Sequence, residues 1–197
     1  MNVFEAMDTA RAMRYLKPDP VPKELLEKLI YYASRASNPG NSQLWQFIVL
    51  QDEDKKRRIG DAIAQSFRDT FERQGLDTEG HSGYYLAAHL AQAPAIIFIG
   101  ARNEYPPWQP DKRFVGSACY PAGQNLIVAA RAMGLGATFT TLHAAASKLV
   151  HETLEIPEEL SIALTIPIGY PQRTFGPVRR KPTDEIIHWD TFSGGKT

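Results

Sequence analysis

Polar residues that could bind an anion or a heterocycle recur at four places in the sequence. They are Arg11 and Arg14, the loop SNPGNSQLW at 37–45, the segment TFTT at 138–141, and the pair Arg179 and Arg180. Arginine pairs bind phosphate oxygens in a bidentate way, and loop amides with Asn41 and Gln43 can hydrogen-bond the edge of a heterocycle. Each place taken singly is more typical of a solvated charge or a turn. It is their joint presence that favours a ligand site.

Other familiar site patterns are excluded. The GLG at 134–136 is no dinucleotide fingerprint, because it follows a predicted helix instead of opening one and position 139 is Phe. No HExxH, GxSxG or phosphate loop GxxxxGK[ST] is present, and the five histidines show no metal spacing, so we expect no metal site. They are His81, His89, His143, His151 and His188. No side chain is thereby identified as a catalytic acid, base or nucleophile.

Length and composition predict one globular domain over residues 1–197. A chain of 197 residues that is 43% hydrophobic and 22% charged can bury a sizeable core. Its formal net charge of +0 gives no broad basic field for nucleic acid, so an anion site must be a local cluster. The lone Cys119 excludes an internal disulfide and a cysteine zinc site, and we expect it in the core of a cytoplasmic protein. The N-terminus lacks the apolar segment of a secretory signal.

The element that must hold these residues together is the uncharged stretch from Phe114 to Ala130. Its polar residues and Arg131 leave it short of the roughly 20 apolar residues that span a membrane, so we read it as a buried helix feeding a buried strand. From Gln124 onward apolar residues occupy nearly every face, which predicts a helix enclosed by protein on all sides, either by its own chain or by its own chain together with a partner subunit. Gly134 ends it, since glycine tolerates the left-handed turn that closes a helix.

The rest of the chain alternates helices and short strands. An amphipathic helix using Val3, Phe4 and Met7 leads into an extended proline-rich arm ending at Pro22, which can open the next helix. The segment 101–113 is irregular and is either a lid or a surface connection. The tail 172–192 carries Phe175, Ile186, Ile187 and Trp189, and we expect it to pack on another surface. The remaining predicted elements are a strand at 46–50, a surface helix to about 74, a helix at 84–91, a strand at 95–100, a short helix at 144–154 and a β-rich run at 160–170.

Five motifs in this order resemble the FMN-dependent nitroreductases, a family of homodimeric α+β flavoproteins, over nearly the whole chain. They are RAMRYLKPDPVP, SNPGNSQLWQFIVL, YLAAHLAQAPAIIFIG, YPAGQNLIVAARAMGLGATFTT and IPIGYPQRTFGPVRRKPTDEIIHWD. The resemblance implies a mostly antiparallel central sheet flanked by helices in an intertwined homodimer. It also implies that the long central helix lies in the dimer interface and that the C-terminal arm, 172–197, packs on the partner subunit.

The resemblance also assigns residues to the cofactor. The family's Arg-Arg-Ser-x-Arg stands here as Ala10, Arg11, Ala12, Met13 and Arg14, so two side-chain contacts are missing. Arg11 should approach the FMN phosphate or ribityl chain, and Arg14 the pyrimidine edge of the flavin. Further implied cofactor residues are the loop lent by the other subunit (Asn38, Pro39, Asn41, Gln43), the segment along the ring (Thr138, Phe139, Thr140, Thr141), and Arg179 with the phosphate-binding Arg180. The backbone N–H of Thr140 is expected to face flavin N5, and Val178 replaces a lysine of some members.

The implied function is transfer of a hydride from NAD(P)H through flavin N5 to a nitroaromatic, a quinone or a similar small electrophile. Donor and acceptor would use one cavity in turn, by a ping-pong mechanism. Because a shared fold does not fix function, enone reduction, dehalogenation and flavin breakdown stay open as alternatives. With Ala10, Ala12 and Val178 in place of usual contacts, a weakly FMN-binding carrier or regulatory dimer with little turnover stays open as well.

Overall fold

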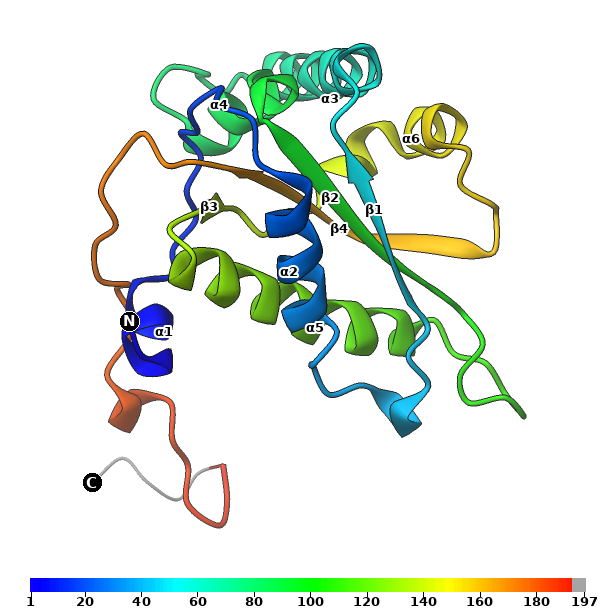
Figure 1. The fold of residues 1–197 in the computed structure, drawn as a ribbon, viewed down its shortest axis with the longest axis vertical. Coiled ribbons are helices and arrows are strands. Elements are labelled where there is room, and N and C mark those ends of the chain that lie inside the picture. Colours follow the sequence, from blue (N-terminus) through cyan, green and yellow to red (C-terminus); the bar gives the residue numbers. More distant parts are fainter. Residues whose placement is uncertain (193–197) are drawn as a thin grey trace.

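The computed structural model describes residues 1–192 as an α+β fold (Figure 1). In this part of the chain one sheet of four antiparallel strands has the order β1-β2-β4-β3. The strands are β1 (Trp45–Leu50), β2 (Ala95–Arg102), β3 (Gly136–Ala137) and β4 (Leu160–Gly169). The predicted antiparallel sheet flanked by helices is thereby confirmed.

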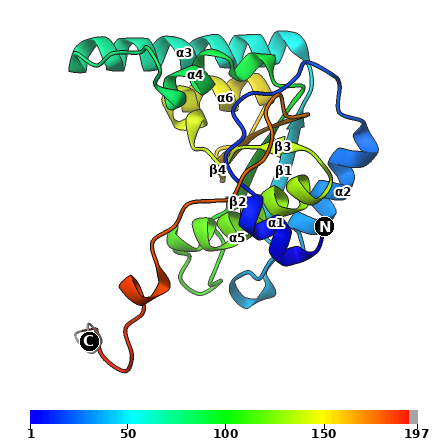
Figure 2. The same cartoon turned by 90° about the vertical axis from the view of Figure 1, so that its left-hand side faces the viewer.

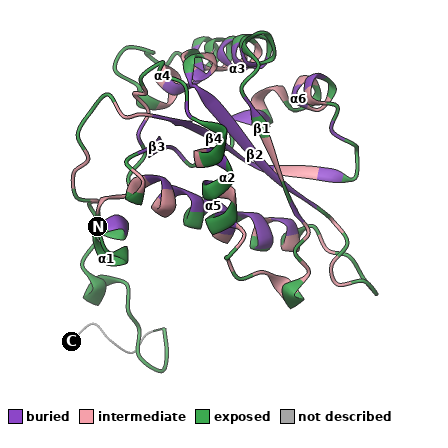
Figure 3. Ribbon diagram, viewed as in Figure 1, coloured by how far each residue is buried: buried purple, intermediate pink, exposed green. Residues whose placement is uncertain are grey.

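Helices cover both faces of the sheet (Figures 1 and 2). Side chains of β2 alternate between two apolar clusters: Ile97 and Ile99 pack with α2 and α5, and Ile96 and Phe98 pack with α3, α4 and α6. Figure 3 shows β2 buried almost throughout, as its unbroken apolar sequence requires. The helices are α1 (Val3–Thr9), α2 (Lys23–Ala33), α3 (Glu53–Gln74), α4 (Ser82–Ala88), α5 (Arg113–Ala132) and α6 (Ser147–Leu154).

α5 is the predicted central helix, and its sheet-facing side is fully buried. Cys119 is 0% exposed there, and burial raises the pKa of its thiol to about 12, so it stays protonated and behaves as a core residue, as predicted. Gly134 follows the helix with φ +78°, the left-handed turn expected of it. Tyr120, Gln124 and Asn125 on the opposite side are exposed in the single chain.

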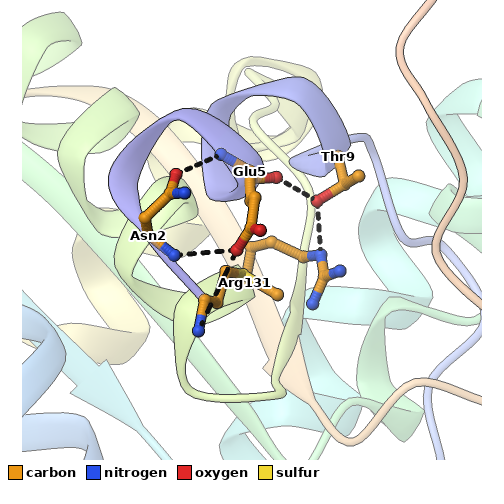
Figure 4. A network of polar contacts seen from close by, with 5 residues as sticks. Asn2, Glu5, Thr9 and Arg131 are labelled. Atoms are coloured by element: carbon orange, nitrogen blue, oxygen red, sulfur yellow. Dashed lines mark hydrogen bonds and ion pairs between the residues drawn. The ribbon is translucent and has the colours of Figure 1, made fainter.

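Arg131 joins the end of α5 to two distant parts of the chain. Its Nε donates to Thr9 Oγ1 at 2.8 Å, and its guanidinium carbon lies 4.2 Å from the centre of the Phe175 ring. Thr9 in turn donates to the Glu5 carbonyl within α1, whose start is closed by reciprocal hydrogen bonds between Asn2 and Glu5 (Figure 4). This network fixes the N-terminal helix and the beginning of the C-terminal arm against α5.

Several boundaries differ from the sequence prediction. Pro22 is the N-cap of α2 and lies before the first helical residue. α4 ends at Ala88 and a 3-10 turn, Leu90–Gln92, replaces its predicted last turn, while another, Leu142–Ala146, precedes α6. The strand expected after Gly134 has only two residues. The segment 103–112 is irregular as predicted, and Trp108 within it is 82% exposed.

The C-terminal arm leaves the body of the chain after running beside the N-terminal arm (Figure 2). Ile186, Ile187 and Trp189 are 59%, 40% and 73% exposed, so the single chain provides no apolar surface for them. Their packing on a partner stays a prediction, and the last five positions of the predicted arm, 193–197, lie outside the described residues. No helix within the described residues is both long and apolar enough to cross a membrane.

Gly100 should be a sensitive position of the sheet. A Cβ there would lie 2.7 Å from the Ser161 carbonyl oxygen and 3.2 Å from the Ile162 Cα, at the irregular step of the β2–β4 pairing. Backbone atoms of a central strand cannot move aside, so Gly100→Ala should lower the free energy of unfolding by about 1–3 kcal/mol.

Urea unfolding of the purified protein measures this, with Gly116→Ala in α5 as the control. A Cβ at Gly116 meets only the exposed Tyr120 ring, which can turn away, so this variant should be as stable as the parent or up to about 1 kcal/mol more stable. Equal free energies of unfolding for the parent and Gly100→Ala would show that the backbone of the sheet can shift at this position to accept a Cβ.

Candidate functional site

The N-terminal arm lies between β3 and the start of the C-terminal arm, held by backbone hydrogen bonds on both sides. On one side the Met13 N–H donates to the Ala137 carbonyl at 3.0 Å. On the other, Lys17 N–H donates to Tyr170 O at 2.8 Å and Val178 N–H donates to Asp8 O at 2.9 Å. Residues 8–17 thus form a ribbon between segments that are more than 120 positions away in the sequence, which brings the early and late arginines together.

These arginines surround one cavity of about 500 Å³. Its charged wall consists of Arg11, Arg14, Arg179 and Arg180. The lining includes no acidic residue, and within the described part of the chain none of the four guanidinium groups forms an ion pair with a carboxylate. A chain of net charge +0 therefore concentrates positive charge here, which is the local cluster that the sequence predicted.

The remaining wall of this cavity comes from two other segments and from small side chains beside the arginines. Gln124 and Ile127 face it from α5, and Phe139, 39% exposed, faces it from the segment after β3. The sequence did not single out Gln124 or Ile127; a polar Gln inside the uncharged stretch was the available signal. The other lining residues have small side chains: Ala10, Ala12 and Val178.

A second cavity, of about 260 Å³, shares Arg14 and Phe139 with the first. The residues 138–142 form one wall, and Phe67 of α3 with Gly83 and Leu86 of α4 form the other. Its lining is mostly apolar apart from Arg14 and the threonine hydroxyls. The α3 and α4 contributions were not predicted, because nothing in their local pattern distinguishes them from core positions.

Two of the predicted cofactor residues, Met13 and Thr140, make contacts inside their own chain. Met13 is only 4% exposed and packs beside Gly136, so its side chain does not line the first cavity. The Thr140 N–H, expected to face the flavin, donates to the Thr165 carbonyl at 3.2 Å. The backbone N–H groups of its neighbours Phe139 and Thr141 have no recorded acceptor among the described residues.

The loop with Asn38, Pro39, Asn41 and Gln43 lies near the start of α5 (Figure 1), whereas the arginine cavity borders Gln124 and Ile127 in the second half of that helix. It lines neither cavity of its own chain. The Gln43 N–H donates to Asn38 Oδ1 at 2.8 Å, and Asn41 and Gln43 both have φ +50°. A loop held in this conformation is preorganised although it contacts nothing in its own site.

The described residues contain no cluster of three or more metal-binding side chains. The cavity instead suits an anion attached to an aromatic ring. Guanidinium groups bind phosphate oxygens through charge-assisted hydrogen bonds, while Phe139 and the free amides beside it can face a ring with polar edges. A volume of about 500 Å³ is typical of a site for a cofactor-sized molecule.

Comparison with known proteins gives relatives of two activities. A protein of Methanothermobacter thermautotrophicus, provisionally named NADH dehydrogenase/NAD(P)H nitroreductase, is 25% identical over 178 residues, covering 89% of this chain and 81% of that relative. Human iodotyrosine deiodinase 1 is 24% identical over 198 residues, covering 93% of this chain and 67% of the relative.

Solved structures share the fold at low sequence identity. An iodotyrosine deiodinase bound to FMN and 3-iodo-L-tyrosine has a TM-score of 0.77 at 19% identity, covering 97% of this chain and 100% of that chain. A variant of an FMN and NADPH-dependent nitroreductase from Sphingopyxis sp. strain HMH has a TM-score of 0.75 at 19% identity, covering 98% and 100%. A model of the nitroreductase family matches residues 8–170, from the N-terminal arm to the end of the sheet. The chain belongs to the nitroreductase family.

Proposed function

We propose that this protein is an FMN-dependent oxidoreductase that passes electrons from NAD(P)H to a nitroaromatic, a quinone or a similar small electrophile. The observation that carries the proposal is the cavity in which four arginines without an acidic partner meet the exposed ring of Phe139. The backbone N–H groups of Phe139 and of Thr141, which lines the adjoining second cavity, have no recorded acceptor among the described residues. Such a wall complements a phosphate at one end and a polar aromatic ring at the other. Membership of the nitroreductase family supports the same cofactor.

Each part of the wall has a role in this proposal. Arg11 and Arg180, with Arg179 beside them, hold the phosphate. Arg14 lies on both cavities and so suits the ring, where its positive charge stabilises the negative charge gained on reduction. The amides of Phe139 and Thr141 replace that of Thr140 as the donors that face N5. Bound FMN supplies hydride chemistry at N5; the protein binds it, orients it and tunes its potential.

We also propose a cytoplasmic homodimer whose two sites each use both chains. Support comes from apolar residues that the single chain leaves exposed, including Val3, Phe4 and Met7 at 57%, 73% and 55%. A further cavity of about 500 Å³ between α1, α2 and α5 has a mainly apolar lining and suits the helix of a second copy. The loop 38–43, preorganised but away from its own cavity, would complete the partner's site, and the arm 172–197 would pack on the partner.

Dehalogenation is a second candidate, favoured by the deiodinase relatives that match 93% of this chain. A carrier role with little turnover is a third, because Ala10, Ala12 and Val178 leave part of the cavity wall without charged or hydrogen-bonding groups. The three candidates share the flavin and differ in the acceptor, so kinetics separates them.

The purified protein should contain FMN, and initial rates at varied NAD(P)H and acceptor should give parallel reciprocal plots, since one cavity serves both substrates in turn. Nitroaromatic, quinone and 3-iodotyrosine are compared as acceptors. Faster turnover of 3-iodotyrosine would favour dehalogenation, and bound flavin without turnover would favour the carrier. Intersecting lines would contradict the shared cavity.

Arg180→Ala should weaken FMN binding by about 1.5–3 kcal/mol, the contribution of a hydrogen bond to a charged group, or roughly tenfold to a hundredfold in Kd. Fluorescence titration of the apoprotein measures this. Lys181→Ala is the matched control, since it removes the next positive charge from a side chain that does not line the cavity. An equal loss of FMN affinity in both variants would mean that only the general positive charge matters. Unchanged affinity in Arg180→Ala would show that the phosphate does not bind at Arg180.

A further inference from the structure

Thr165 of β4 lies behind the segment that borders both cavities. It is 0% exposed, and its backbone pairs with Thr140 in both directions, with N···O distances of 2.9 and 3.2 Å. The Thr140 hydroxyl also donates to the Thr165 carbonyl, at 2.7 Å. Because the backbone of Thr140 is hydrogen-bonded to Thr165, the amides of Phe139 and Thr141 on either side of it are directed away from Thr165.

The Thr165 hydroxyl holds the other end of the same segment. Its Oγ1 accepts a hydrogen bond from the His143 N–H at 3.2 Å and lies 2.9 Å from His143 Nδ1. His143 is itself only 7% exposed. The chain from 140 to 143 thus curls around one buried residue, which contacts it through two backbone groups and one side-chain oxygen.

The donors and acceptors of Thr165 and His143 can all be paired if the imidazole is neutral. Burial lowers the pKa of His143, nearby His151 lowers it further, and a hydrogen bond with the backbone of Ile162 acts in the opposite direction. In a neutral ring with its proton on Nε2, Nδ1 accepts a hydrogen bond from the Thr165 hydroxyl, and the oxygen of that hydroxyl accepts one from the His143 backbone N–H. Both buried side chains and the backbone group between them are satisfied together.

We propose that the buried Thr165–His143 pair positions the flavin-facing amides of Phe139 and Thr141. The pair touches neither cavity, so both are positioning residues that act through the segment 139–142. The start of the same segment is fixed by Thr138, whose hydroxyl donates to the Met13 carbonyl at 2.8 Å. This hydrogen bond joins the segment to the N-terminal arm, which carries Arg11 and Arg14. This inference rests on the proposed function, since it assigns the amides to FMN.

Thr165→Val tests the proposal, because it keeps the shape of the side chain and removes the hydroxyl. The expected result is a Kd for FMN raised about tenfold, an absorption band of saturated flavin shifted toward that of free FMN, and faster hydrogen exchange of amides 139–142 in the apoprotein. Thr165→Ser keeps the hydroxyl and should restore all three. Thr153→Val is the matched control: Thr153 is also buried, but its Oγ1 has no hydrogen-bond partner, so its loss should change none of them.

A second pair of variants tests the proposal if Thr165→Val does not fold. His143→Asn keeps an acceptor near Nδ1 and should bind FMN as the parent does, whereas His143→Leu should show the weaker binding and the shifted band. If Thr165→Val had the FMN affinity, the flavin absorption band and the amide exchange of the parent, this inference alone would be overturned. Equal FMN binding by the two His143 variants would overturn it as well. A parent protein without affinity for FMN would overturn the proposed function and this inference with it.

Discussion

The structure depends on the backbone hydrogen bonds that hold residues 8–17 between β3 and the C-terminal arm. They join Met13 to Ala137 and Asp8 to Val178, and so force four arginines around one cavity. Like charges at this spacing repel one another, and the described residues offer no carboxylate to offset them. A bound phosphate would remove that repulsion. Cofactor binding should therefore stabilise the fold itself, because the ligand binds only the arrangement that the ribbon creates.

The rest of the fold keeps this ribbon in place. β2 is buried on both faces and pairs with β4, which carries β3 at its other edge, so the wall next to Met13 is part of the central sheet. From the opposite side, Arg131 fixes the end of α5 to Thr9 and to Phe175. The cavity is therefore bounded by the sheet, α5 and two arms.

The elements with strong local patterns were predictable from the sequence. The length of α3, with Asp52 at its N-cap, and the end of α5 before Gly134 follow from capping residues and uninterrupted periodicity. The grouping of Arg11 and Arg14 with Arg180 rested on their shared phosphate-binding chemistry and on family resemblance, because no local sequence pattern predicts a contact across so many residues. For the same reason the sequence did not predict that Met13 packs beside Gly136 or that the Thr140 N–H donates to the Thr165 carbonyl. The second cavity was missed because Phe67 and Leu86 look like ordinary core residues.

The central claim is that each FMN site combines the arginines of one chain with the loop of the other, and mixed dimers test it most directly. One chain carries Arg11→Ala with Arg180→Ala, and the other carries Asn41→Gly with Gln43→Gly, glycine being chosen because both loop positions have φ +50°. Purified through two different tags, the mixed dimer should bind one FMN with the affinity of the parent, because one site receives both defects and the other none. A mixed dimer with two weakened sites, or a stable monomer that binds FMN fully, would contradict the shared site.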